Sequence, residues 1–362
     1  MKTLALFLSA LLFIAAPLRA ADAADMLRVL AYDRSIPREV CLSFTEKTGI
    51  PVEVVSTISS MEAADFLYRK KEAFDLLILS NDVVRAMRDR DRLVPLNLKK
   101  IRNISEIKSA WSKAAGDAQG KFRIPFDVAA MGILVNKSVP QPPVTGYMDA
   151  FRKPRPGGVA VMTDQRDLLA AALLSLGASV NELSTDNLRA SRSILKDWLR
   201  NIAPGSSAVW SNDHAAAFNA LRKDLVEGRL GAALLYSGDA YSLMTEYPGR
   251  FEWITPTEGS LKYMTVLAIP ASSTKADAAH QFIDFILDPR IAGELVTSAS
   301  PGLGLNLPKE KIPLNFYGNP ANIEASQLMD DFSVQADITR EPRQEVLDLF
   351  KSLPAPTAPP AP

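Results

Sequence analysis

Polar side chains gather at four places where an apolar segment gives way to a helix-forming segment. Their carboxylates could hold a cationic group, and paired carboxylates can also act as general acid and base. The four groups are Asp33-Arg34-Ser35, Ser80-Asn81-Asp82, Thr163-Asp164-Gln165-Arg166-Asp167 and Ser237-Gly238-Asp239. In an α/β sheet, ligands usually bind outside the carboxyl ends of the strands. These corners are therefore candidate parts of one ligand site.

Helix capping is the alternative explanation for each group. Ser35, Ser80 and Thr163 are residue types that are favoured at the N-cap of a helix. Aspartate is also favoured in the first helical turn by the helix dipole. If Asp164 is the cap, Asp167 stands at the third helical position and completes a near capping box. For a single aspartate capping is the more common role, and the presence of a carboxylate at all four corners makes ligand binding an equally good interpretation.

Enzymatic chemistry has little support in the sequence. Asp164 and Asp167 are three residues apart on one helical turn, whereas acid–base carboxylates normally face each other across a substrate. The chain contains one cysteine, Cys41, and two histidines, too few for a disulfide or a Cys/His metal cluster. We expect Cys41 to be a buried small residue. No nucleophile, zinc or phosphate-loop motif is present, so we expect no catalytic residues, no metal site and no cofactor.

The corners must be positioned by strands and helices that alternate along the chain. Hydrophobic periodicity predicts strands at 27–32, 50–56 and 74–80, with helices at 37–49, 60–73 and 81–93. The pattern restarts with strands at 157–163, 230–237 and 262–270 and helices at 164–177, 186–202, 213–229 and 275–296, the last broken near Pro289. This order predicts parallel sheets with right-handed crossovers in two α/β cores.

Composition and the two ends of the chain bear on its location. The 362 residues are enough for two domains, and 41 basic against 41 acidic residues leave no basic excess for nucleic acid. Residues 1–23 combine Lys2, a short apolar run and small residues at a cleavage site, which predicts a secretory signal peptide and a periplasmic protein. A membrane helix is the alternative, but the apolar run is too short. Residues 351–362 predict a disordered Pro/Ala-rich tail.

Eight segments, in their order and spacing, resemble periplasmic solute-binding proteins of the spermidine/putrescine type, which serve ABC importers. The resemblance implies an α/β fold of two lobes (type II), with parallel sheets, crossing hinge strands and a ligand cleft between the lobes. It places residues 24–127 plus 261–305 in lobe 1 and residues 128–260 plus 306–350 in lobe 2. The segments begin at "LRVLAYDRS", "FDLLILSND", "RIPFDVAAM", "VAVMTDQRD", "YSGDA", "TPTEGS", "YMTVLAIPA" and "LGLNLP".

Several ligand contacts of that family carry over to matching residues. The acidic pair that holds one ammonium group falls on Asp164 and Asp167. Aromatic wall positions fall on Tyr236 and Tyr263, and a serine that lines the cleft falls on Ser211. The resemblance therefore implies that one ammonium-binding end of the cleft is preserved.

Other contacts depart from the family pattern. Arg34 takes the place of a tryptophan that boxes the polyamine chain, and Thr265 replaces an aspartate that holds an inner nitrogen. Asp82 and Asp127 stand where aromatics are common, and a late tyrosine becomes Gly302. Arginine repels a polyamine unless an acidic residue such as Asp33 pairs with it, but it binds carboxylates bidentately. A zwitterion, with its acid on Arg34 and its amine on the acidic pair, therefore fits better than a polyamine. The alternative is that Arg34 points to solvent or forms a structural ion pair.

We therefore expect a solute-binding protein that captures a small polyamine-like or zwitterionic amine. A sensory or interaction protein that keeps the fold but has lost polyamine binding is the alternative. The expected partners are the amine-bearing ligand and an inner-membrane ABC permease, with no nucleic acid, and the protein is expected to be a monomer. The predicted ligand-binding residues are Asp33, Arg34, Ser35, Ser80, Asp82, Asp127, Asp164, Asp167, Ser211, Tyr236, Asp239, Tyr263 and Thr265.

Overall fold

The computed structural model describes most of the chain between Met26 and Ser298 and a C-terminal helix. The described residues are 26–33, 35–57, 60–107, 112–113, 115–206, 214–298, 321, 332–333, 340–354 and 356. The predicted signal peptide, Arg34, Ser211 and Gly302 lie outside them. Among the described residues, no helix is both long and apolar enough to cross a membrane.

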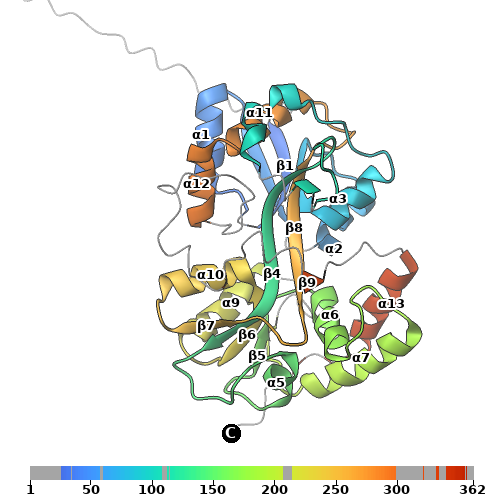
Figure 1. The fold of residues 1–362 in the computed structure, drawn as a ribbon, viewed down its shortest axis with the longest axis vertical. Coiled ribbons are helices and arrows are strands. Elements are labelled where there is room, and N and C mark those ends of the chain that lie inside the picture. Colours follow the sequence, from blue (N-terminus) through green and yellow to red (C-terminus); the bar gives the residue numbers. More distant parts are fainter. Residues whose placement is uncertain are drawn as a thin grey trace, which may run out of the picture.

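Two lobes are joined by two long neighbouring strands, β4 (Ile124–Asn136) and β8 (Ser260–Ala268), which run from one lobe into the other (Figure 1). These strands pair antiparallel, with Ala129 opposite Tyr263 and Asp127 opposite Thr265. The fold is thus the two-lobe α/β architecture that the sequence predicts.

The upper lobe of Figure 1 is built on three parallel strands, β1 (Leu27–Tyr32), β2 (Val52–Thr57) and β3 (Leu76–Ser80). The connecting helices are α1 (Arg38–Thr48), α2 (Ser60–Ala64), which continues as a π-helical segment over Asp65–Lys70, and α3 (Asn81–Arg88). Gly49 ends α1 with a φ of 76°, a conformation that glycine adopts without steric cost. Two 3-10 turns follow at Leu98–Lys100 and Arg102–Glu106, and α11 (Ala276–Ile286) and α12 (Pro289–Ser298) complete the lobe.

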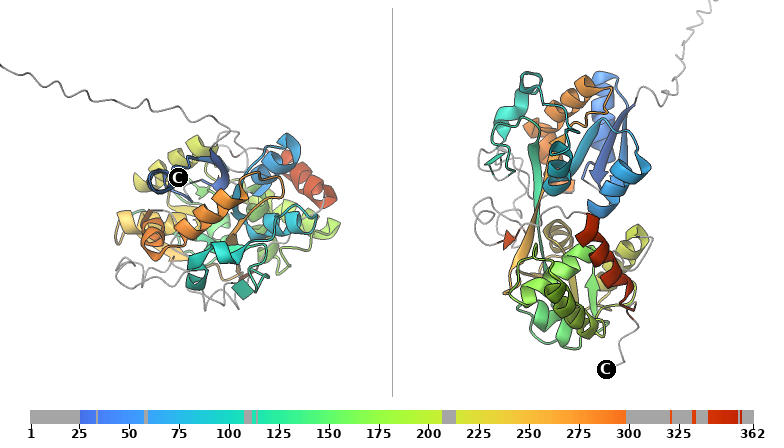
Figure 2. Two further views of the ribbon diagram at one scale, coloured as in Figure 1. Left: turned by 90° about the horizontal axis from the view of Figure 1, so that it is seen from above. Right: turned by 90° about the vertical axis from the view of Figure 1, so that its right-hand side faces the viewer.

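The lower lobe is built on β5 (Val159–Val161), β6 (Ala232–Tyr236) and β7 (Phe251–Ile254). Its helices are α5 (Tyr147–Arg152), α6 (Gln165–Ser175), α7 (Thr185–Trp198), α9 (His214–Val226) and α10 (Ser237–Glu246). The C-terminal helix α13 (Arg340–Lys351) packs against α6 and α7 (Figure 2). A two-residue strand, β9 (Phe332–Ser333), pairs with the start of β8.

The sheet runs through both lobes in the order β2-β1-β3-β8-β4-β6-β5, with β7 paired to β4. The pairs β1–β2, β1–β3 and β5–β6 are parallel, as predicted. The pairs β3–β8, β4–β8, β4–β6 and β4–β7 are antiparallel, and β4 and β8 cross between the lobes in opposite directions. The carboxyl ends of β1 and β3 and those of β5 and β6 therefore bring the predicted corners to the region where the lobes meet.

Each lobe has its own apolar core. Phe44, Phe282 and Leu76 belong to a core of the upper lobe, and buried Cys41 belongs to it too, as expected. Phe151, Trp198 and Leu169 belong to a core of the lower lobe. Leu353 is buried in that lower core, so the chain is packed for three residues beyond residue 350. The predicted tail therefore begins too early at residue 351, because the sequence pattern does not reveal that Leu353 contacts the core.

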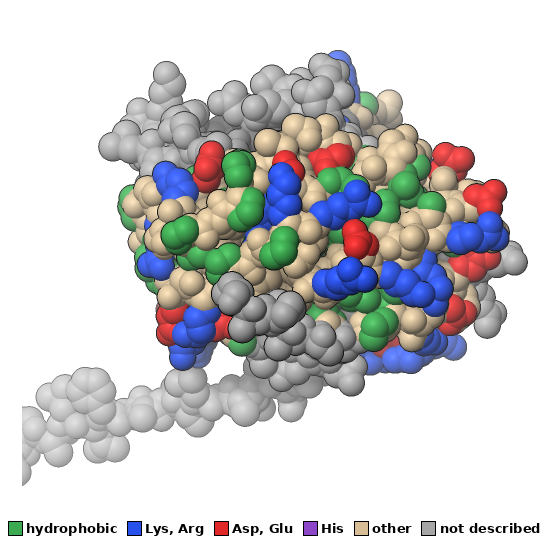
Figure 3. Space-filling model, turned by 90° about the horizontal axis from the view of Figure 1, so that it is seen from below, with side chains coloured by type: hydrophobic (Ala, Val, Ile, Leu, Met, Phe, Trp, Pro, Cys, Tyr) green, Lys and Arg blue, Asp and Glu red, His purple; other side chains and the backbone are tan. Residues whose placement is uncertain are grey.

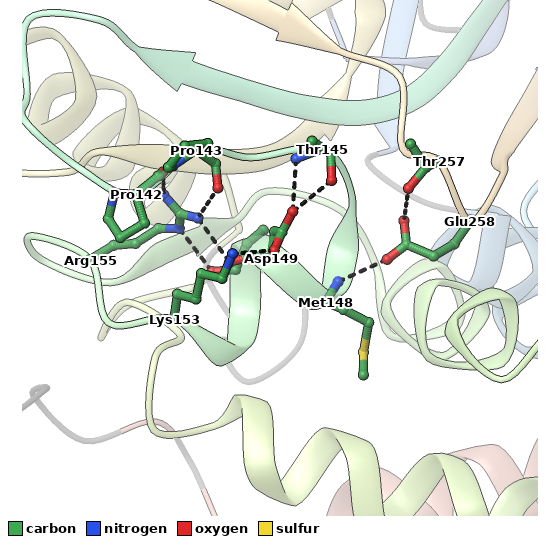
Figure 4. A network of polar contacts seen from close by, with 10 residues as sticks. Pro142, Pro143, Thr145, Met148, Asp149, Lys153, Arg155, Thr257 and Glu258 are labelled. Carbon is green, nitrogen blue, oxygen red and sulfur yellow. Dashed lines mark hydrogen bonds and ion pairs between the residues drawn. The ribbon is translucent and has the colours of Figure 1, made fainter.

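Arg155 anchors the loop that precedes α5 in the lower lobe (Figure 4). Its buried guanidinium donates hydrogen bonds to the carbonyl oxygens of Ala150, Pro142, Pro143 and Asp149, at 2.7 to 3.3 Å. The end of this lobe carries Lys and Arg side chains interspersed with Asp and Glu (Figure 3).

Candidate ligand-binding site

A capping box begins α6 and places two carboxylates side by side. The side chain of Asp164 accepts a hydrogen bond from the backbone N–H of Asp167 at 3.0 Å, and Oδ2 of Asp167 accepts one from the backbone N–H of Asp164 at 3.4 Å. The capping interpretation is therefore correct for this corner. Capping does not exclude ligand binding, because the same interactions fix both carboxyl groups at the carboxyl end of β5.

Two tyrosines hold the carboxylate of Asp167 from neighbouring strands. Tyr236, at the end of β6, donates its hydroxyl hydrogen to Oδ2, and Tyr263, in the middle of β8, donates to Oδ1 at 2.5 Å. The two rings meet edge to face, with centroids 5.3 Å apart and planes at 82°. Asp167 is 1% exposed, whereas Asp164 and both tyrosines are partly exposed. Tyr236 and Tyr263, which are 69 and 96 positions from Asp167 in the sequence, thus form one compact group with it.

Burial and mutual repulsion make ionisation of the acidic pair unfavourable. Burial, followed by the charge of Asp167, raises the pKa of Asp164 to about 8. Burial also raises the pKa of Asp167, although the two tyrosine hydroxyls oppose this shift. The pKa values of Tyr236 and Tyr263 lie well above the usual value, first because of burial and then because of Asp167. Both tyrosines therefore donate as neutral hydroxyl groups.

A second polar group lies in the upper lobe, at the ends of β1 and β3. The hydroxyl of Tyr32 lies 3.0 Å from Oγ of Ser60, which lies 2.9 Å from Oγ of Ser80. The backbone N–H of Ser80 donates to the Tyr32 hydroxyl at 3.4 Å. Burial, followed by the charge of Asp82, raises the pKa of Tyr32 above its usual range. Tyr32 is the aromatic side chain that the described structure places at this corner.

The crossing strands connect the two polar groups. Ser80 of β3 is paired with Thr265 of β8, and Thr265 is also paired with Asp127 of β4. Tyr263 is two residues before Thr265 and therefore projects from the same face of the strand, about 7 Å away. Tyr32 also contributes to the raised pKa of Tyr236, after burial and the two aspartates.

The predicted residues thus divide by their surroundings. Asp164, Asp167, Tyr236 and Tyr263 form one contacting group, and Thr265 of β8 lies between Ser80 of β3 and Asp127 of β4. Asp33 is exposed in the turn after β1, Ser35 is partly exposed in the same turn, and Asp82 and Asp239 are partly exposed in the first turns of α3 and α10. Arg34 and Ser211 lie outside the described residues.

The capping interpretation is wrong for Ser35 and Thr163, and for Ser80 it is right in position but not in the side-chain hydrogen bond. Pro37, not Ser35, precedes α1, and Asp164, not Thr163, caps α6. Ser80 stands at the N-cap of α3 but its side chain makes no cap hydrogen bond, because it contacts Ser60 instead. Ser60 and Tyr32 were missed as site residues, and the only sequence signal was that each lies next to a strand end.

The arrangement is suited to a cation that donates hydrogen bonds. The raised pKa of Asp164 means that a positive charge beside the pair would be stabilised, since an ammonium group favours the ionised form of a neighbouring carboxyl. No group of three or more residues among those described is arranged to hold a metal ion. The site therefore offers carboxylates, hydroxyl groups and aromatic rings.

Comparison with known proteins is consistent with this architecture. Residues 39–302 match the family described as bacterial extracellular solute-binding proteins. The chain is 25% identical, over 90% of its length and 92% of the relative, to a spermidine/putrescine-binding periplasmic protein of Escherichia coli. It is 24% identical to a putrescine/cadaverine-binding protein of Pseudomonas aeruginosa, over 78% and 80% of the two chains. The solved structure of a Treponema pallidum lipoprotein superposes with a TM-score of 0.72 at 21% identity, over 91% of this chain and 99% of that one.

Proposed function

Since this chain belongs to the bacterial extracellular solute-binding proteins, we propose that it captures a small amine-bearing solute between its lobes for an ABC importer. The acidic pair Asp164 and Asp167 binds one ammonium group of the ligand. The rest of the ligand lies along β8 toward Thr265 and the hydroxyl groups of the upper lobe.

The observation that carries this proposal is the pair of carboxyl groups held together at the start of α6. Asp167 is fixed by two tyrosine hydroxyls, and Asp164 is partly exposed beside it. The rings of Tyr236 and Tyr263 adjoin the pair, and an aromatic ring next to a desolvated cation contributes about 0.5–2 kcal/mol to binding. Charge and aromatic contact therefore favour the same type of ligand group.

The relatives support an amine as the ligand. The names of the relatives from Escherichia coli and Pseudomonas aeruginosa specify spermidine, putrescine and cadaverine. A zwitterion is the second candidate ligand class, because Thr265 stands where the resemblance places an acidic residue and the sequence has an arginine, Arg34, two residues after Tyr32. By the same family relationship, the protein is proposed to act in the periplasm as a monomer that delivers its ligand to an inner-membrane permease.

Calorimetry with a panel of amines tests the proposal. The mature chain is titrated with putrescine, cadaverine, spermidine, agmatine and several amino acids. We expect saturable binding of at least one compound, and we expect Asp164→Asn to weaken it at least about 30-fold, as for loss of a charged hydrogen bond. Asp186→Asn is the matched control, because Asp186 is an exposed aspartate in the first turn of α7.

Two results would oppose the proposal. If none of these compounds binds, capture of an amine is wrong, and the alternative of a sensory or interaction protein gains support. If an amine binds with equal affinity to the parent protein and to Asp164→Asn, the ligand contacts another part of the chain.

A further inference from the structure

We propose that the Asp164–Asp167 pair holds one proton when the site is empty and releases it when the ammonium group of a ligand arrives. Capture of an amine is then coupled to the release of a proton into the solvent. This inference rests on the proposed function, because it concerns the same carboxyl groups.

The first argument is the chemical nature of the hydrogen-bond donors. Asp167 accepts from the hydroxyls of Tyr236 and Tyr263 and from the backbone N–H of Asp164. Asp164 accepts from the backbone N–H of Asp167. All of these donors are electrically neutral, so they orient the two carboxyl groups without supplying a positive charge. Two adjacent carboxyl groups in such surroundings share a proton more readily than they ionise together.

The second argument is the distribution of charge around the pair. Arg166, on the same helical turn, lowers the pKa of both carboxyls, but burial has the larger and opposite effect on each. Among the described residues, Tyr236 of β6 and Tyr263 of β8 contact the pair from other elements, and Tyr147 of α5 interacts with the charge of Asp167. Tyr147 also feels the negative charge of Glu258 from the turn before β8. These described neighbours beyond α6 therefore contribute neutral phenols and negative charge.

The proposed exchange conserves charge within the site. In the empty protein the pair carries one negative charge and one proton on a carboxyl oxygen. The ligand arrives as R–NH₃⁺, the O–H bond of the carboxyl breaks, and the proton passes to water or buffer. The ammonium hydrogens then donate to the oxygen that carried the proton. One positive charge therefore replaces another at the same place.

Calorimetry in buffers with different ionisation enthalpies measures the number of protons released. Putrescine is titrated into the parent protein at pH 7.0 in phosphate, imidazole and Tris, and the apparent binding enthalpy is plotted against the buffer enthalpy. We expect release of about 0.9 proton per ligand at pH 7.0, falling to about 0.1 at pH 9.0, as for a group that titrates near pH 8. Below pH 8, the affinity for putrescine should increase by up to about tenfold for each unit by which the pH is raised.

The controls distinguish this inference from the proposed function. Binding of putrescine with no proton release at either pH would overturn the inference and leave the proposed function intact. If putrescine does not bind, carboxyl ¹³C NMR of the ligand-free protein decides the matter. We then expect one aspartate resonance that titrates above pH 7 in the parent protein and is missing from Asp164→Asn. Ordinary titration of every aspartate near pH 4 would overturn the inference.

Discussion

The hydroxyl oxygen of Tyr263 lies 2.5 Å from Oδ1 of Asp167, although the two residues are 96 positions apart in the chain. One residue belongs to a crossing strand and the other to the first turn of α6. The contact therefore ties the lower lobe to the strand that enters the upper lobe, and it does so at the carboxyl group that we propose for ligand binding.

Substitution of Tyr263 by phenylalanine removes this hydrogen bond and keeps the ring. A hydrogen bond to a charged group contributes about 1.5–3 kcal/mol. We therefore expect about 10-fold or greater loss of amine affinity in calorimetry, because the Asp167 carboxylate becomes harder to ionise. Tyr247→Phe is the matched control and should bind like the parent protein, because Tyr247, at the end of α10, meets Phe251 of β7 edge to face and lies outside the proposed site. Equal loss in both variants would contradict the expectation.

Two substitutions at Asp164 separate helix capping from charge. Asparagine is as good an N-cap as aspartate, whereas alanine loses the cap at a cost of about 1 kcal/mol. We expect Asp164→Asn to be at least as stable as the parent protein and Asp164→Ala to have a free energy of unfolding lower than that of Asp164→Asn by about that amount, in urea denaturation at pH 6. Both variants should lose amine binding. An asparagine variant that is as unstable as the alanine variant would mean that the charge itself stabilises the fold.

The stability of the parent protein and that of Asp164→Asn should also depend on pH in different ways. The pKa of Asp164 is about 8 in the folded protein, whereas the ordinary aspartate value of 3.8 applies in the unfolded chain. The folded state thus binds this proton more tightly, so its contribution is fully present below about pH 4 and is lost as the pH rises to about 8. Asp164→Asn has no such proton, so its stability does not fall for this reason as the pH rises. We expect its Tm, relative to that of the parent protein, to rise between pH 5 and pH 9, and a constant difference would refute the shift.

Arg155 should be hard to replace even by lysine. Its guanidinium donates to four carbonyl oxygens and to Oε1 of Gln141 at 3.0 Å, and an ammonium group has too few donors in the wrong geometry. Buried acceptors that lose their partners are costly. We expect Arg155→Lys to lower the free energy of unfolding by about 3 kcal/mol in urea denaturation. Arg152→Lys, at an exposed ion pair with Asp197, is the control and should change it by less than about 0.5 kcal/mol.

The thiol of Cys41 should react slowly in the folded protein. Burial, followed by the nearby charge of Glu39, raises its pKa from 9.0 to about 11, and the residue is 8% exposed. The thiolate fraction at pH 8 is then roughly 100-fold lower than for a free thiol, before the limited access is considered. We expect labelling by a disulfide reagent at pH 8 to be at least that much slower than in urea. Equal rates would show that α1 opens readily.

Local patterns predicted the elements well where the apolar residues formed uninterrupted or periodic runs. β1 covers the predicted residues 27–32, and the spacing of Asp164 and Asp167 predicted the capping box. β4 and β7 were not assigned as strands from periodicity. β4 leaves one lobe for the other, so the surroundings of its two faces change along its length and regular alternation is lost.

The sequence predicted which types of residue belong to the candidate site, but it did not predict which of them contact one another. Tyr236 and Tyr263 were expected as aromatic walls, yet nothing local indicates that both hydroxyls converge on Asp167. Ser80 looked like a cap, but its partner Ser60 is 20 residues away and belongs to another helix. Such pairings depend on how the strands are ordered in the sheet, which is a long-range property.

The continuity of β8 has a consequence for how binding specificity could change in this protein. Tyr263 and Thr265 are carried by one uninterrupted strand, so their separation of about 7 Å is set by backbone geometry and not by the angle between the lobes. A ligand bound along β8, as we propose, would therefore meet these two side chains at a fixed separation. An exchange at position 265 would alter which chain length or second functional group is accepted, while the ammonium group would keep its place beside Asp164. Selectivity for ligand length could therefore be tuned independently of amine recognition.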